Sequence, residues 1–232
     1  MTLKPVQNGR PTPIVLEIVG PAGSGKSTVF DGLLRADGCI ERKPVLSRSP
    51  YRLLLVRHLA SALATLARLR MLGRRTTRSQ VAMMAYLRAL PHAVDGRRTG
   101  LDRVVVFDQG PVYFLTRPSI RDRRLAAWWD RTAEIWSDRL DAIIWLDAPD
   151  EVLLERINSR PKGHALKGRP EEDACAVIVQ SRAVYQGVLE RLEAEGGGPV
   201  ILSFDTSSRT PYEVVGDVLA AVSRHAPARA SL

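Results

Sequence analysis

A glycine-rich segment near the start of the chain constrains its fold more than any other feature. Its sequence, from 20 to 28, is GPAGSGKST, which satisfies the Walker A (P-loop) pattern G-x-x-x-x-G-K-[ST]. The flanking sequence supplies the context that this pattern requires. An apolar run at 14–19 predicts a buried strand before it, and 27–35 has helical spacing after it. The chain therefore contains a strand, a phosphate-binding turn and a helix in direct succession.

The residues of this segment have the chemistry that polyphosphate binding needs. Glycines let the backbone curl so that successive N–H groups point at phosphate oxygens, and the helix N-terminus adds its positive end. We expect Lys26 to reach the β- and γ-phosphates of ATP, and the Ser27 hydroxyl to take a position on Mg²⁺. The predicted nucleotide-binding residues are Gly20, Ala22, Gly23, Ser24, Gly25, Lys26, Ser27 and Thr28.

The remaining hydrophobic pattern predicts a single α/β domain. Strands are expected at 14–19, 39–46, 104–107, 142–146 and 200–204. The predicted helices between them are 27–35, 51–72, 79–90 (ended near Pro91), 123–140, 150–159, 171–194 and 211–224. Apolar strands that alternate with helices are typical of a parallel sheet covered on both faces. We divide the chain into a flexible N-terminus (1–13), a P-loop domain (14–224) and a flexible tail (225–232).

Composition excludes several other classes. The chain has 232 residues, of which 45% are hydrophobic and 25% charged, and these values are ordinary for one globular domain. Cys39 and Cys175 lie far apart, so they form neither a disulfide framework nor a zinc ribbon, and free thiols fit a reducing compartment. We recognise no signal peptide or transmembrane segment, and we expect a cytoplasmic protein.

The net charge of +9 arises from one segment of the chain. Residues 42–101 contain 13 basic residues and a single acid, Asp95, whereas the rest of the chain has a net charge of −3. Such a surplus favours an anionic partner, either a polyanion or a membrane face, although it can also be the solvated surface of a long helix. Tyr51 and Tyr86 are the only aromatics in the segment, so evidence for a nucleic-acid partner is not strong.

Charged residues elsewhere complete a candidate phosphotransfer site. Asp108 follows the strand at 104–107, at the end where a ligand crevice forms, and can organise Mg²⁺ or accept a proton from an acceptor hydroxyl. Arg156 and Arg160 lie four residues apart on one predicted helix face, where they can neutralise charge on the γ-phosphate. They belong to a basic lid (about 156–170) that also contains Lys162, Lys167 and Arg169. Asp147 has the same topological position as Asp108, but it can also cap the helix that follows.

Other P-loop classes lack their signatures here. A GTPase needs N-K-x-D, and neither Asn8 nor Asn158 stands in that pattern. An ABC ATPase needs LSGGQ, which is absent, and too little chain remains for the lid subdomain of an AAA+ motor. A small phosphotransferase remains.

The order of these features resembles the nucleotide and nucleoside kinase branch of P-loop proteins, most closely the thymidylate-kinase-like group. The sequence AYLR at 85–88 resembles the acceptor-binding arginine helix of that group. WLDAPDEV at 145–152 resembles the strand and helix that lead into its lid, and FDTS at 204–207 resembles its last strand and adenine-side loop. The resemblance implies strand order 2-3-1-4-5, ATP and Mg²⁺ as cofactors, and transfer of the γ-phosphoryl group to a small acceptor, a nucleotide or nucleoside.

Two departures from this group concern the acceptor. Thymidylate kinases have Asp-Arg and an aromatic after the third strand, and deoxynucleoside kinases have Glu-Arg-Ser, whereas this chain has DQGP at 108–111. In place of Arg-Glu-Pro-Gly after the second strand, it has SRSP at 47–50. We expect Arg88, Arg48 and Gln109 to contact the acceptor. The predicted catalytic residues are Lys26, Asp108, Arg156 and Arg160, and the predicted metal-binding residues are Ser27 and Asp108.

Two alternative functions stay open. One is a P-loop kinase of a non-nucleotide metabolite, such as a sugar, an antibiotic or a lipid-linked hydroxyl, which the Asp108-Gln109 departure favours. The other is a nucleotide-dependent protein that binds a polyanion or a membrane through its basic segment. The sequence also leaves a homodimer open.

Overall fold

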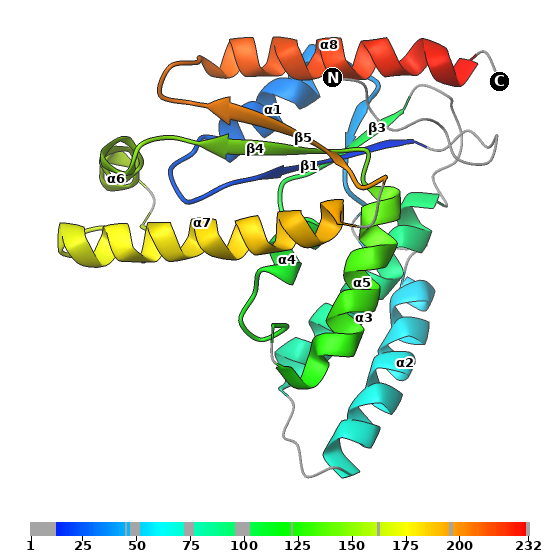
Figure 1. Cartoon of the computed structure of the whole chain (residues 1–232). Helices are drawn as coiled ribbons and strands as arrows, with labels where there is room; N and C mark the ends of the chain where they lie inside the picture. Colours follow the sequence, from blue (N-terminus) through cyan, green and yellow to red (C-terminus); the bar gives the residue numbers. More distant parts are fainter. Residues whose placement is uncertain are drawn as a thin grey trace.

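Five parallel strands form the centre of the molecule (Figure 1). The computed structural model describes residues 13–44, 46, 52–71, 77–95, 103–121, 123–161, 163–194 and 197–230. The strands are β1 (Ile14–Val19), β2 (Ile40–Arg42), β3 (Val104–Phe107), β4 (Ala142–Asp147) and β5 (Val200–Asp205). Their order in the sheet is β2-β3-β1-β4-β5, which confirms the predicted order.

Helices occupy most of the chain between and after these strands. They are α1 (Lys26–Ala36), α2 (Arg52–Met71), α3 (Arg78–Asp95), α4 (Pro111–Leu115), α5 (Ala126–Arg139), α6 (Asp150–Ser159), α7 (Glu171–Glu193) and α8 (Pro211–Ala230). A short 3₁₀ turn, Arg123–Leu125, precedes α5. Within the described residues the fold is therefore the predicted single α/β domain of the P-loop type.

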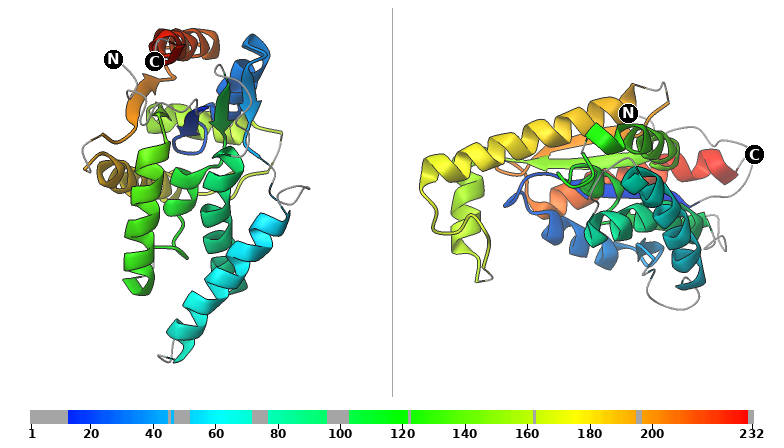
Figure 2. Two further views of the ribbon diagram at one scale, coloured as in Figure 1. Left: turned by 90° about the vertical axis from the view of Figure 1, so that its right-hand side faces the viewer. Right: turned by 90° about the horizontal axis from the view of Figure 1, so that it is seen from below.

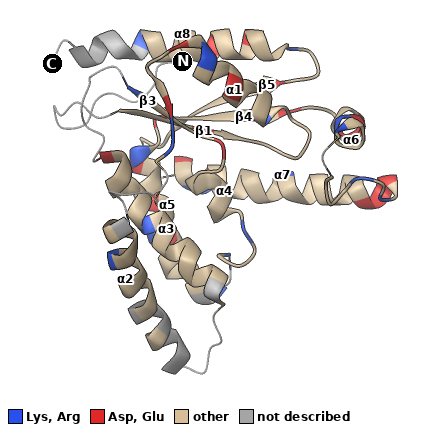
Figure 3. Cartoon of the chain, turned by 180° about the vertical axis from the view of Figure 1, so that it is seen from behind, with Lys and Arg blue, Asp and Glu red and all other residues tan. Residues whose placement is uncertain are grey.

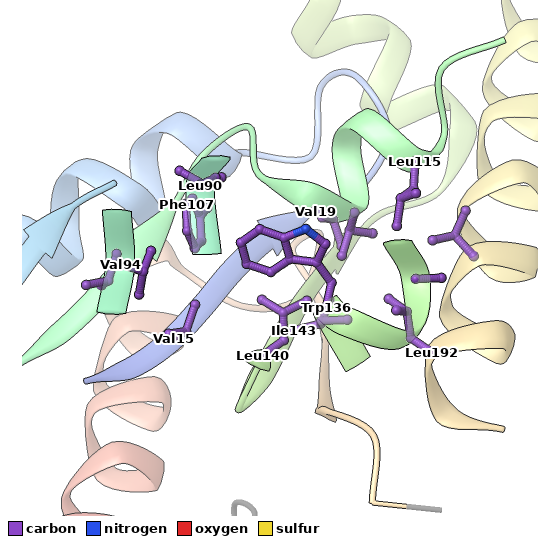
Figure 4. Packing of buried hydrophobic residues seen from close by; sticks show 14 of the residues in the cluster. Val15, Val19, Leu90, Val94, Phe107, Leu115, Trp136, Leu140, Ile143 and Leu192 are labelled. Atoms are coloured by element: carbon purple, nitrogen blue, oxygen red, sulfur yellow. The ribbon is translucent and has the colours of Figure 1, made fainter. Parts of the chain in front are cut away.

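The two faces of the sheet bury alternate residues of the same strands. Leu16 and Ile18 of β1 pack with α1 and α8 on one face, whereas Val15 and Val19 pack with α3, α5 and α7 on the other. Trp136 of α5 lies at the centre of the second cluster (Figure 4). It is fully buried, and its ring lies 6.0 Å from the ring of Phe107 in an edge-on arrangement. Both faces of every central strand are covered, which explains why these strands are almost entirely apolar.

Parallel pairing places the ends of the strands together. β1 pairs with β3 on one side and with β4 on the other, so that Val19 lies beside Trp145 and Glu17 lies beside Phe107. The glycine-rich segment begins where β1 ends. Residues that follow β2 and β3 therefore lie on one side of it, and residues that follow β4 and β5 lie on the other.

α2 and α3 form a pair that extends away from the sheet (Figures 1 and 2). Ala62 of α2 and Met84 and Ala85 of α3 belong to a separate buried cluster, which also includes Trp128. α2 lies at the periphery in all three views, with α3 between it and the sheet.

Three helical predictions were wrong. α3 continues through Pro91 to Asp95, because Ala93 and Val94 are buried against the sheet and this packing outweighs the missing N–H of proline. α4, which the sequence analysis did not anticipate, begins with Pro111, a residue suited to the first helical turn. α8 extends to Ala230, beyond the predicted end at 224 and into the predicted tail.

The predicted flexible N-terminus falls almost wholly outside the described residues, which begin at 13. None of the helices that the structure describes combines the length and the apolar character needed to cross a bilayer.

Candidate active site

The loop at 20–25 adopts the conformation that phosphate-binding loops require. Gly20 has a φ of 147°, and a Cβ there would lie 2.0 Å from the carbonyl oxygen of Leu146. Gly23 has a φ of 88°, and its Cβ would lie 2.7 Å from the carbonyl oxygen of Leu153. Only glycine tolerates both the left-handed backbone and this close approach. The loop is therefore held tightly between β1 and the segment that follows β4.

Lys26 begins α1 and points back into this loop. Its Nζ donates hydrogen bonds to the carbonyl oxygens of Gly20 (2.8 Å) and Pro21 (2.6 Å), and it lies 3.4 Å from the Ser24 hydroxyl. Burial, and next the nearby Arg160 guanidinium, lower the pKa of Lys26 to about 8, although Asp147 acts in the opposite direction. An ammonium group held by two backbone carbonyls of the phosphate-binding loop is well placed to bind phosphate oxygens.

A cavity of about 540 Å³ lies beside the loop, a size in the range of small-molecule sites. Three segments enclose it: the phosphate-binding loop with the start of α1, the end of α6, and the loop between β5 and α8. The lining residues are Gly23, Ser24, Gly25, Thr28, Val29, Arg156, Ser159, Arg160, Thr206, Ser207, Ser208, Arg209, Thr210, Pro211 and Val214. The structure thus brings both predicted arginines to the same cavity as the loop.

These two arginines have different surroundings. Arg156 donates from Nη1 to the Thr206 hydroxyl (2.9 Å) and from Nη2 to the Thr206 carbonyl oxygen (2.7 Å). It therefore ties α6 to the loop after β5. Arg160 follows the end of α6, and its charge acts on Lys26. Of the pair, Arg160 is the one placed beside the phosphate-binding lysine.

The lid contributes a histidine that sequence reasoning missed. His164 Nδ1 accepts the backbone N–H of Leu166 at 3.2 Å. Burial lowers the pKa of His164, and so do the charges of Arg160 and Lys26. The predicted lid cations differ in placement. Lys167 donates to the Arg160 carbonyl oxygen, Arg169 lines a separate hollow beside Glu155, and Lys162 lies outside the described residues.

On the opposite side of the loop, Asp108 follows β3 as predicted and forms an ion pair that the sequence did not indicate. Its Oδ1 accepts the Gln109 amide at 2.9 Å and lies 3.1 Å from Lys43 Nζ. Lys43 follows β2 directly and also donates to the Gln109 carbonyl oxygen. Its side chain is mostly buried, while that of Asp108 is half-exposed. A positive and a negative group thus meet at the carboxyl ends of two adjacent strands, and we call this region, with Lys43, Asp108 and Gln109, the Asp108 corner.

Glu17 supports this corner from inside the sheet. It is fully buried in β1, and its two carboxylate oxygens accept the backbone N–H groups of Gly110 (2.9 Å), Val112 (2.8 Å) and Tyr113 (2.9 Å). Burial raises the pKa of Glu17 to about 7, although these hydrogen bonds and Lys43 act in the opposite direction. Glu17 therefore fixes the start of α4, the segment that directly follows Asp108. A lone acid inside the apolar run at 14–19 was the signal that could have identified it.

α3 turns Tyr86 rather than Arg88 toward this corner. The Tyr86 ring lies 5.1 Å from that of Phe114, and burial, followed by Glu17 and Asp108, raises the pKa of Tyr86 to about 12. Arg88, two residues later, lies on a different side of the helix. Arg88 lines a cavity of about 350 Å³ between α2, α3 and α5, together with His58 and His92, whose rings stack at 5.1 Å. The structure therefore does not bring Arg88 together with Asp108, and Arg48 lies outside the described residues.

The aspartate that ends β4 has a structural partner. Asp147 accepts Nε of Arg182 at 2.8 Å, while Nη1 of the same arginine lies 2.5 Å from Asp150 Oδ1 and Nη2 lies 2.7 Å from the Ala148 carbonyl oxygen. Arg182 thus ties α7 to the junction between β4 and α6. Neither Asp147 nor Asp150 supplies a side-chain cap to α6, so the alternative prediction of a cap was wrong.

Within the described part of the chain, the predicted magnesium ligands, Ser27 and Asp108, are single oxygen donors rather than part of a metal-binding cluster. The described residues contain no group of three or more acidic, histidine or cysteine side chains able to hold a metal ion. Magnesium at phosphate sites needs only one or two protein oxygens, because phosphates and water supply the rest. Ser27 is exposed next to Lys26, and its hydroxyl fits this role. Asp108 is a second oxygen donor, at the carboxyl end of β3.

Solved structures with the same architecture include a kinase. A deoxyadenosine kinase from M. mycoides with products dCMP and a flexible dCDP bound is 13% identical and has a TM-score of 0.52, and the alignment covers 91% of this chain and 100% of that chain. The same enzyme with bound dCTP is 15% identical with a TM-score of 0.48, covering 90% of this chain and 100% of that chain. At this identity the first likeness shows a shared fold. No curated protein sequence gives a match.

A sequence profile of one protein family, described as an AAA domain, matches residues 15–187. The match runs from β1 to α7 and includes the phosphate-binding loop, Asp108 and the lid. After β5 the described chain continues with α8, which packs back on the sheet beside α1, so the described residues contain no AAA+ motor lid subdomain. Since the match covers most of the sequence, the chain belongs to this family of AAA domains.

Proposed function

We propose that this protein is an ATP- and Mg²⁺-dependent phosphotransferase, a P-loop kinase that moves the γ-phosphoryl group of ATP to a small acceptor. One observation carries the proposal: the phosphate-binding loop has a nucleotide-sized cavity on its β4–β5 side and an Asp108–Lys43 pair on its β2–β3 side. Phosphoryl transfer needs donor and acceptor on opposite sides of the moving group. The shared fold with a deoxyadenosine kinase supports the same reaction class.

The donor side has residues for the phosphates and for the base of ATP. The loop amides and Lys26 would bind the β- and γ-phosphates, and Arg160 would neutralise charge on the transferring group. Arg156 would hold the loop at 206–211 against the base rather than touch the γ-phosphate, because its described hydrogen bonds go to Thr206. Ser27 would hold Mg²⁺, which would supply positive charge to the phosphates, whereas Asp108, the other predicted metal-binding residue, is assigned to the acceptor.

The acceptor side has a group that can take the proton. Lys43 and the Gln109 amide hold Asp108 Oδ1. We assign the other oxygen, Oδ2, to the acceptor hydroxyl, whose proton it would accept as the oxygen attacks phosphorus. Glu17 acts through α4 and keeps Asp108 in place, so it is a positioning residue.

The proposed acceptor is a nucleotide or nucleoside, as in the thymidylate-kinase-like group. A non-nucleotide metabolite is the second candidate. It is favoured because Gln109 follows Asp108 where the kinases of that group have arginine, and because the described cation at this corner is Lys43. A cytoplasmic location and a homodimer remain predictions.

The test is ADP release from Mg·ATP with each nucleoside, nucleoside monophosphate and simple sugar in turn. We expect one class to give an acceptor-dependent signal that Lys26→Ala and Asp108→Asn each reduce about 100-fold or more, while circular dichroism stays unchanged. The matched carboxylate control is Asp130→Asn, which changes a half-exposed aspartate of α5 and should retain full activity. Turnover that survives Lys26→Ala would contradict the proposal.

A further inference from the structure

The outer face of α2 exposes a row of aliphatic side chains. Leu53, Val56, Leu59 and Leu63 are exposed by 79%, 60%, 37% and 52% of their surfaces. The residues at 53, 56, 59 and 63 recur every three or four positions, so they lie along one side of the helix. We call Leu53, Val56, Leu59 and Leu63 the outer face of α2.

The opposite side of the same helix is already packed. Leu54 and Leu55 lie against the buried clusters beneath the sheet, and Ala62 is buried beside α3. α2 is therefore apolar on two sides. Helices of this kind are normally enclosed on both sides, whereas the side chains of the outer face are exposed and α2 lies at the periphery of the molecule (Figures 1 and 2). An aliphatic row of this length marks a contact surface.

Charge identifies the kind of partner. α2 contains four arginines, at 52, 57, 68 and 70, and no acid, and Arg57 is exposed. Figure 3 shows basic but no acidic residues along the described part of this helix. The surrounding segment, 42–101, has a net charge of +12. Two copies of the chain that met through α2 would bring two such segments together, and their repulsion disfavours this packing. The charge therefore calls for an anionic partner.

The side chains on the outer face distinguish between anionic partners. Nucleic acids are bound through stacking aromatic residues and hydrogen-bonding groups, and the outer face consists of leucine and valine. Aliphatic residues flanked by arginine are typical of helices that lie in the headgroup region of a bilayer. In such helices the aliphatic side chains insert among the acyl chains while basic side chains meet lipid phosphates.

We propose that the outer face of α2 docks this protein on an anionic membrane surface, with the helix lying along the surface. The proposal is independent of phosphotransfer, because α2 contributes no residue to the nucleotide cavity or to the Asp108–Lys43 pair.

The test is co-sedimentation of the full chain with vesicles of phosphatidylcholine, with and without phosphatidylglycerol. We expect sedimentation with the anionic vesicles only, weakened by high salt. The triple variant Leu53→Gln, Val56→Gln, Leu63→Gln should lower the affinity about tenfold or more, since each substitution removes a buried aliphatic contact. Arg57→Gln should lower it about fivefold. The control is Val177→Gln, Val179→Gln, which changes two exposed valines of α7 and should bind like the wild type.

Three results would overturn the proposal. The first is no sedimentation with anionic vesicles, or equal binding by the triple variant. The second is binding to RNA or heparin that equals or exceeds vesicle binding. The third is a dimer, detected by light scattering, that the triple variant converts to a monomer, because the outer face would then bind a second copy. ADP release without vesicles should be the same in all variants, which verifies that they fold.

Discussion

Glu17 is a fully buried carboxyl group whose ionised form is unfavourable but whose oxygens hold the start of α4. A carboxylate without water is unfavourable, yet three backbone amides at the start of α4 bind its oxygens. Burial outweighs these bonds, and the pKa of Glu17 rises from 4.5 to about 7. Between these two values the folded protein holds a proton that the unfolded chain releases.

This proton makes the stability of the protein depend on pH. Because the folded-state pKa is the higher one, the stabilisation is complete below pH 4.5 and is lost as the pH rises to about 7. We expect the wild type to lose as much as about 3 kcal/mol of unfolding free energy over this interval relative to Glu17→Gln, which does not titrate. Urea unfolding of both proteins at a series of pH values measures this difference. Parallel curves would show that folding does not raise the pKa of Glu17.

Gly110 is required by the close approach of Glu17. A Cβ at this position would lie 2.7 Å from the Cβ of Phe107 and 2.8 Å from the Glu17 carboxylate. We expect Gly110→Ala to cost about 1–3 kcal/mol, measured by urea unfolding, because neither neighbour has room to move. Gly187 in the middle of α7 has no atom within 4 Å of such a Cβ. Gly187→Ala should therefore stabilise the protein by about 0.5–1 kcal/mol through helix propensity, and a loss in both variants would contradict the steric reason.

At the scale of elements, α6 and the loop after β5 act as one unit. Two hydrogen bonds from Arg156 reach Thr206, and Thr206 also donates its N–H and its hydroxyl to the Asp147 carbonyl oxygen, at 2.8 Å and 3.0 Å. If the phosphotransferase proposal is right, this unit shapes the pocket for the ATP base, whereas Arg160 lies beside Lys26.

Substitutions of Arg156 and Arg160 should therefore change different kinetic constants. We expect Arg156→Met to raise KM for ATP about tenfold with little change in kcat, since it loosens the base pocket. Arg160→Met should instead lower kcat about 100-fold, because it removes charge from the transition state. Steady-state kinetics over a range of ATP concentrations separates the two effects. Equal losses of kcat in both variants would mean that Arg156 also reaches the γ-phosphate.

The elements that the sequence predicted best are those with strong periodicity and a clear boundary. The strand at 104–107 and the helix at 150–159 have the predicted bounds, and the strand order was implied by the resemblance. Local rules failed where tertiary packing decided the outcome, as in α3, which continues through Pro91. In the candidate site, likewise, one part was predictable from the sequence and the other was not. The glycine-rich motif located Lys26, but the partners of Asp108 depend on strand pairing, and no spacing in the sequence links Glu17, Lys43 and Asp108.

At the scale of the whole molecule, the sheet joins two separate cores. Leu33 of α1 is buried in the core beneath α8, whereas the four tryptophans lie on α5 and β4 and none belongs to that core. Adjacent residues of each strand belong to opposite cores, so the loss of one core should destabilise the other.

We expect Leu33→Ala to lower the free energy of unfolding by about 2–5 kcal/mol, and the change should appear in tryptophan fluorescence although no tryptophan contacts the mutated core. Denaturation followed by fluorescence and by far-ultraviolet circular dichroism checks this. Coincident midpoints indicate one cooperative unit. A fluorescence transition that does not move would mean that the two cores unfold separately.

The position of β1 at the centre of the sheet also has a consequence for how such proteins diversify. The chain builds one flank first, with β2 and β3, and only then crosses β1 to build the other flank with β4 and β5. The strands of the Asp108 side, β2 and β3, are therefore encoded ahead of those of the Arg156 side, β4 and β5. A single recombination event between α4 and α5 would exchange one pair of outer strands for that of a relative, and it would succeed where α5 and α7 still pack against the new α4.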